Sequence, residues 1–174
     1  MGVLRRVGRR VLSRVAEQVA RNDLFEKPGE RSWQGPLPMH ARAGSAAEAH
    51  PAGPALVHHW ATWCEPCEQE LPLVERLAKE LPDGISVLGV SWDRFQDDGP
   101  LARTLERVEA MAQKQGLSWP TLVLTDGPEE SFEALGLDHH TVPQTLLVGA
   151  DGSVLHHVRG PLDEASIAAL KARL

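Results

Sequence analysis

Residues 55–67 read ALVHHWATWCEPC, and this stretch decides the fold of the 174-residue chain. Its first part, Ala55 to Ala61, is a short apolar run that favours a β-strand. Apolar residues then recur at helical spacing, namely at Leu71, Val74, Leu77, Ala78 and Leu81. The stretch therefore predicts a strand that leads into a helix, with a Cys-x-x-Cys motif at the junction.

The Cys-x-x-Cys motif indicates redox chemistry. Cys64 is expected at the N-terminus of the helix, where unpaired N–H groups and the helix dipole stabilise a thiolate. Cys67 follows one turn later and is expected to be more buried. Pro66 needs no amide hydrogen in the first turn, so the two sulfurs can lie close enough to open and close a disulfide. A structural zinc site takes four ligands, and the chain has no second pair of cysteines.

Apolar runs and helical patterns alternate along the rest of the chain. Further strands are predicted at 85–90, 121–125, 145–148 and 154–158, and further helices at 100–116, 129–135 and 163–174. The pair Asp151-Gly152 predicts a hairpin between the last two strands. The order predicts a three-layer α/β domain over residues 55–174, with parallel strands joined by right-handed crossovers and an antiparallel edge.

The two segments before residue 55 differ in character from this domain. Residues 1–22 carry a net charge of +5, whereas the remainder carries −11. Apolar residues at helical spacing predict a basic amphipathic helix over residues 3–21, which needs an apolar surface on its own domain, a partner or a membrane. Residues 23–54 predict a linker or an edge hairpin, with a short strand pair within Trp33 to Ala43.

Composition restricts the classes of function. The chain is 42% hydrophobic and 24% charged, which suits a single globular core. Its net charge of −6 argues against nucleic acid as a partner. No run approaches 18 apolar residues, and the arginine-rich start lacks the apolar segment of a secretion signal. These features favour the cytoplasm.

Residues 63–67, Trp-Cys-Glu-Pro-Cys after an apolar strand, resemble the active site of the thioredoxin superfamily. The resemblance is specifically to the bacterial TlpA/ResA-like thiol-disulfide oxidoreductases. Val142-Pro143 before a strand resembles their cis-proline loop, and Pro72 and Gly160 fit the helix proline and the glycine after the last strand. The likeness extends over the predicted domain. It implies a thioredoxin-like α/β/α fold with a mixed sheet. Because ResA-like relatives mostly work outside the cytoplasmic membrane, it also implies the cell envelope as an alternative location for this chain.

The resemblance also implies roles for individual residues. Three residues are expected to bind the substrate: Trp63, Val142 and Pro143. The backbone of Val142 would pair with an extended substrate segment and present the target disulfide to Cys64. Glu70 resembles the active-site glutamate of the ResA-like group. Burial would raise its pKa toward neutrality, so that it accepts and returns the proton of Cys67. The alternative is a solvated helix glutamate.

Three further residues are expected to tune the site. His58 stands six residues before the first cysteine, where thioredoxins carry a buried aspartate and the ResA-like group often an asparagine. It is either a proton relay or a hydrogen-bonded strand residue, and only one of His58 and His59 can face the cysteines. Pro66 shapes the first turn. Glu65 places a negative charge near the thiolate, which points toward a reductant.

The sequence therefore predicts a monomeric protein-disulfide reductase that works through a mixed disulfide. It would need no metal or cofactor besides the cysteine pair, and its partners would be protein disulfides and an upstream electron donor. The alternative is a copper-delivery module similar to Sco-type chaperones, with Cys64, Cys67 and His140 as ligands, although those proteins space their cysteines differently. The Pro-x-x-x-Thr-x-x-Cys pattern of peroxiredoxins is absent.

Overall fold

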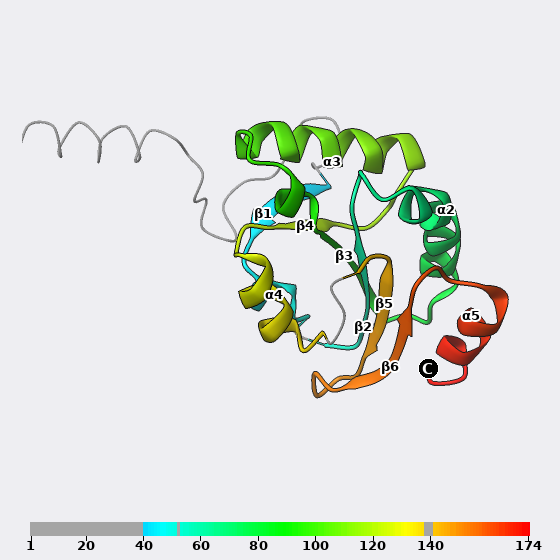
Figure 1. Cartoon of the computed structure of the whole chain (residues 1–174). Helices are drawn as coiled ribbons and strands as arrows, with labels where there is room; N and C mark the ends of the chain where they lie inside the picture. Colours follow the sequence, from blue (N-terminus) through cyan, green and yellow to red (C-terminus); the bar gives the residue numbers. More distant parts are fainter. Residues whose placement is uncertain (1–39, 52, 138–140) are drawn as a thin grey trace, which may run out of the picture. The chain divides into compact units, whose positions relative to one another are not determined.

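The fold is that of a mixed six-stranded sheet covered by helices. The computed structural model describes residues 40–51, 53–137 and 141–174. The strands follow the order β1-β4-β3-β2-β5-β6 across the sheet (Figure 1). Neighbours among the first four are parallel, whereas β5 is antiparallel to β2 and β6 to β5. The strands are β1 Ala41–Gly44, β2 Ala55–Trp60, β3 Ser86–Ser91, β4 Thr121–Leu124, β5 Gln144–Val148 and β6 Val154–Arg159.

Within the described residues, three helices and two 3-10 turns connect these strands, and a fourth helix follows β6. They are η1 Ala46–Ala49, α2 Glu65–Glu80, η2 Asp93–Gln96, α3 Leu101–Gln115, α4 Pro128–Leu135 and α5 Glu164–Lys171. Right-handed crossovers place α2 and α3 on the same face of the sheet. Lys114 of α3 lies 2.6 Å from Glu68 of α2, and α5 adjoins α2 through Lys171 and Glu80. α4 packs near η1 (Figure 1). The predicted three-layer arrangement is confirmed.

Strand β2 is the part of the sheet that leads to the cysteines. It lies between β3 and β5, and all six of its side chains are buried. A strand that is covered on both faces consists mainly of apolar residues, which explains why most residues of β2 are apolar. His58 and His59 are the exceptions. His58 faces Glu70 of α2, whereas His59 contacts Trp92, so the prediction that the two point to opposite sides is confirmed.

At the two ends of the described part, the structure shows an edge strand and a last helix shorter than the sequence predicts. Ala41–Gly44 forms a parallel edge strand with β4, and the backbone N–H of Ala41 donates to Glu109 Oε2 at 2.8 Å. This strand has four residues and none that is β-branched or aromatic, so its sequence carries no strand signal. Most of the strand pair predicted within Trp33 to Ala43 lies outside the described residues. The helix predicted over residues 163–174 ends earlier, at Lys171, and Leu174 beyond it is exposed.

The predicted amphipathic helix over residues 3–21 lies outside the described residues. In the ranges that the structure does describe, no helix has the length and apolar character needed to cross a membrane.

Candidate active site

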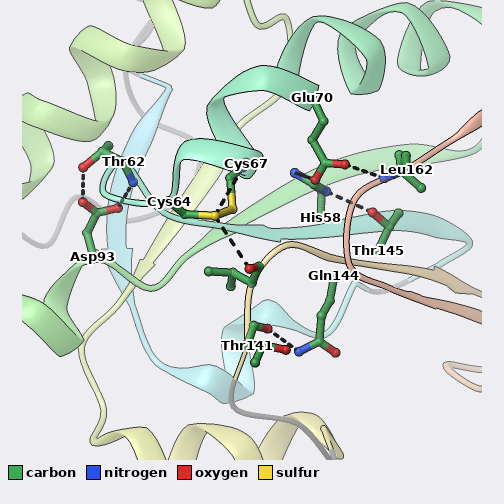
Figure 2. The surroundings of a disulfide bond; sticks show 11 residues. His58, Thr62, Cys64, Cys67, Glu70, Asp93, Thr141, Gln144, Thr145 and Leu162 are labelled. Carbon is green, nitrogen blue, oxygen red and sulfur yellow. Dashed lines mark hydrogen bonds and ion pairs between the residues drawn. A yellow bond between two sulfur atoms is a disulfide. The ribbon is translucent and has the colours of Figure 1, made fainter.

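Cys64 and Cys67 lie at the N-terminus of α2 and form a disulfide (Figure 2). Cys64 is the N-cap residue, and its Sγ accepts a hydrogen bond from the backbone N–H of Cys67 at 3.2 Å. Pro66 occupies the first turn, as predicted. Cys64 keeps 6% of its surface exposed and Cys67 none. Cys64 is therefore the less buried of the two cysteines and the one with some surface open to a partner, next to N–H groups that stabilise a thiolate.

The loop before β5 lies against the exposed sulfur. The Val142–Pro143 peptide bond is cis, as the resemblance implies. The carbonyl oxygen of Val142 lies 3.7 Å from Cys64 Sγ. The carbonyl of Pro143 accepts a hydrogen bond from the N–H of Gly160 at 3.0 Å, which ties the loop to the end of β6. Trp63, 43% exposed, lines the same cavity as Val142. The three residues predicted to bind substrate thus lie around Cys64.

Glu70 is buried within α2, with only 5% of its surface exposed. Its Oε2 accepts a hydrogen bond from the backbone N–H of Leu162 at 2.6 Å. Burial raises the pKa of Glu70 to about 7, against the lowering effect of the Leu162 N–H. The alternative of a solvated helix glutamate is therefore wrong. A carboxyl with this pKa can both take up and release a proton near neutral pH.

His58 faces Glu70 from the strand below the disulfide (Figure 2). Its Nε2 lies 3.6 Å from Glu70 Oε1, and its Nδ1 lies 3.0 Å from Thr145 Oγ1. Burial lowers the pKa of His58 to about 3, so the ring is neutral. Within the described ranges, Nε2 of His58 and Oε1 of Glu70 have no hydrogen-bond partner. The two groups thus form a buried pair that can hold one proton near the disulfide.

The raised pKa of Glu70 has a consequence for stability. Because the pKa is about 7 in the folded protein and 4.5 is its usual value, the free energy of unfolding falls as pH rises between these values. Because glutamine does not titrate, Glu70→Gln should not show this fall in the free energy of unfolding. We expect the variant to gain about 3 kcal/mol relative to the wild type between pH 4.5 and pH 8.

Urea unfolding of both proteins with the disulfide closed measures this difference. Protonation of His58 and His59 in the unfolded chain occurs in both proteins and cancels. A difference that stays constant with pH would show that folding leaves the pKa of Glu70 at its usual value.

Glu65 lies at the start of α2 and is exposed. Its Oε1 accepts a hydrogen bond from Gln69 Nε2 at 3.2 Å. Its carboxylate is therefore solvated, and its effect on the Cys64 thiolate is screened by water. The tuning role of Glu65 stays a prediction.

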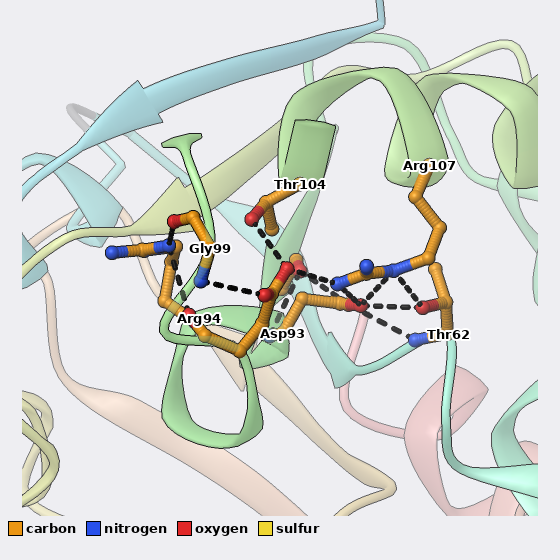
Figure 3. Close-up of polar contacts among 8 residues, drawn as sticks. Thr62, Asp93, Arg94, Gly99, Thr104 and Arg107 are labelled. Carbon is orange, nitrogen blue, oxygen red and sulfur yellow. Dashed lines mark hydrogen bonds and ion pairs between the residues drawn. The ribbon is translucent and has the colours of Figure 1, made fainter. Parts of the chain in front are cut away.

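A polar network that sequence reasoning missed holds the turn before Cys64 (Figure 3). Asp93 is fully buried, and its Oδ2 accepts hydrogen bonds from the N–H of Thr62 at 2.9 Å and the hydroxyl of Ser91 at 2.8 Å. The Thr62 hydroxyl donates to Asp93 Oδ1. Arg107 reaches the same oxygen at 3.2 Å and Asp97 Oδ2 at 3.0 Å. The network links α3 to the residue two before the exposed sulfur.

The histidine doublets contribute no metal site within the described residues. His140, the third ligand of the alternative copper site, lies outside them. His157 contacts Gln144 Oε1 at 2.7 Å through its Nε2. In the part of the chain that the structure describes, no group of three or more His, Cys, Asp or Glu side chains is placed to hold a metal ion.

Comparisons with known proteins agree with this geometry. The AhpC/TSA family model matches residues 42–157. The thioredoxin-like protein YneN of Bacillus subtilis is 31% identical over 54% of this chain and 55% of its own length. The thiol:disulfide interchange protein DsbE of Allochromatium vinosum is 32% identical over 63% and 52%. This chain thus spans about half the length of these relatives.

Solved structures show the same fold. StoA from Bacillus subtilis matches with a TM-score of 0.53 and 19% identity, covering 69% of this chain and 83% of that one. A thiol-disulfide oxidoreductase from Bacteroides fragilis matches with a TM-score of 0.54 and 25% identity, covering 73% and 85%. The predicted thioredoxin-like fold is confirmed.

Proposed function

Because this chain belongs to the AhpC/TSA family and has a thioredoxin-like fold, we propose that it is a thiol-disulfide oxidoreductase acting as a protein-disulfide reductase. One observation carries the proposal. Cys64 caps α2, and its Sγ lies 3.7 Å from the Val142 carbonyl, so a sulfur and a backbone edge face the same approaching chain. The DsbE relative bears a name of the same activity, which supports the proposal.

The first step starts from the reduced pair. The thiolate of Cys64 attacks one sulfur of a partner disulfide, which breaks that bond and releases the other partner sulfur as a thiolate. A mixed disulfide now joins Cys64 to the partner. The N–H of Cys67, which contacts Cys64 Sγ, and the α2 dipole stabilise negative charge on this sulfur. The backbone of Val142 pairs with the partner segment and fixes the angle of attack.

The second step closes the pair and frees the partner. The Cys67 thiol loses its proton and its sulfur attacks Cys64 Sγ, which breaks the mixed disulfide and releases the partner thiolate. Glu70 accepts the proton, with His58 as its buried neighbour, and then returns it to solvent or to the leaving sulfur. The partner gains two electrons and the protein ends as the disulfide seen in the structure. A dithiol donor restores the reduced pair by the reverse exchange.

Insulin reduction by dithiothreitol tests this proposal directly. We expect catalytic amounts of the protein to accelerate insulin precipitation several-fold. The same protein, reduced and then alkylated with iodoacetamide, serves as the control and should have no effect. The reduced protein is also titrated with Cu(I). One-to-one binding that is lost in His140→Ala, without any insulin reduction, would replace the proposal by the copper-delivery alternative.

A further inference from the structure

A cavity of about 310 Å³ opens beside the active site. The described residues that line it are Trp63, Trp92, Phe95, Gln96, Pro128, Glu129, Phe132, Thr141 and Val142. Trp63 and Val142 belong to the active-site turn and the cis-proline loop, and the others come mostly from η2 and α4. The cavity is therefore continuous with the surface where the partner disulfide must dock.

Aromatic rings form the inner wall of this cavity. The rings of Trp92 and Phe132 are stacked with centroids 4.4 Å apart, and Phe95 meets Trp92 edge-on at 4.8 Å. The indole N–H of Trp92 donates to His59 Nδ1 at 3.1 Å, which fixes the ring. A wall held in this way is preformed, so a guest side chain binds without the cost of ordering it. Flat aromatic guests suit it best, because stacked and edge-on ring pairs are both favourable.

The position of the cavity limits what can occupy it. Val142 lines the cavity, and its carbonyl oxygen lies 3.7 Å from Cys64 Sγ. An extended chain advances about 3.3 Å per residue, so a residue close in sequence to the target cysteine can place its side chain there. A small disulfide that reaches Cys64 would leave the cavity empty. The space suits one large side chain of a polypeptide.

We propose that this cavity binds an aromatic side chain of the substrate polypeptide, within a few residues of the cysteine that Cys64 attacks. The inference rests on the proposed function and narrows its substrate class. Glu129 is the one charged side chain among the described lining residues, and no basic lining residue balances it. A basic residue beside the aromatic one is therefore favoured over an acidic one.

Single-turnover kinetics with short peptides test the proposal. Each peptide carries one cysteine in a disulfide with 2-nitro-5-thiobenzoate. This group becomes coloured when the disulfide breaks and releases it. Phenylalanine stands two residues before or two residues after that cysteine, and alanine replaces it in matched peptides. We expect the reduced protein to react about tenfold faster with one of the phenylalanine peptides than with its alanine partner.

Variants at the rim of the cavity locate this preference. Glu129→Trp and Gln96→Trp add bulk at two exposed lining positions, and each should bring the ratio of the two rates close to one. Glu133 is exposed on α4, the helix of Glu129, but does not line the cavity, so Glu133→Trp should keep the tenfold ratio. Equal rates for phenylalanine and alanine peptides with the wild type would overturn the inference. Absence of reaction with every peptide would instead overturn the proposed function.

Discussion

Replacing Cys67 by serine is expected to trap this protein in a covalent complex with its substrate. The exposed sulfur of Cys64 can still attack a partner disulfide, but Cys67→Ser leaves no second thiol to release the partner. Cys64→Ser removes the nucleophile itself. We expect disulfide reduction to fall by about 10³-fold or more in either variant, because the exchange needs both thiols and each variant lacks one of them.

The two variants differ in what they accumulate. Non-reducing gel electrophoresis with a disulfide-bonded protein such as insulin should show a mixed disulfide with Cys67→Ser that dithiothreitol removes. Cys64→Ser is the matched control, because it keeps one thiol but only the fully buried one. Capture by Cys64→Ser and not by Cys67→Ser would mean that the order of the two sulfurs is reversed from the proposed mechanism.

The features that sequence alone predicted are those with local causes. A strand that ends in Trp60 and a helix that starts after Cys64 follow from apolar spacing, and Pro66 and the capping sulfur fix the first turn. Gly116 ends α3 in the left-handed conformation, as a helix stop requires. Resemblance supplied the cis bond before Pro143. Each of these depends on neighbours within a few residues or on a short motif.

The features that sequence could not supply depend on contacts between distant residues. Thr62 and Asp93 are 31 positions apart and meet only because β2 and β3 are adjacent and parallel, so that their carboxyl ends share one edge. Arg107 joins them from a helix whose exposed face looks like any charged surface. The role of Asp93 in holding Thr62 is therefore visible only in the structure.

The pairing of Glu70 with His58 is a second contact of this kind, and it leads to the other large expected effect. Glu70→Gln keeps the size and polarity of the side chain but cannot take up the proton of Cys67. We expect it to slow the release of the partner from the mixed disulfide by about a hundredfold near pH 7. In the wild type this rate should rise with pH around 7, where Glu70 becomes the carboxylate that accepts the proton.

The pH profile separates proton transfer from a structural role. In Glu70→Gln the rate should rise only near the ordinary thiol pKa of about 8.5, because Cys67 must then lose its proton to solvent. Stopped-flow release of a labelled partner from the mixed disulfide measures both profiles. A variant that is uniformly slower but keeps the wild-type midpoint would show that Glu70 only supports the packing of α2. The stability difference between the two proteins levels off above the pKa of Glu70 in the folded protein, so agreement of that pH with the kinetic midpoint would assign the proton to the Glu70–His58 pair.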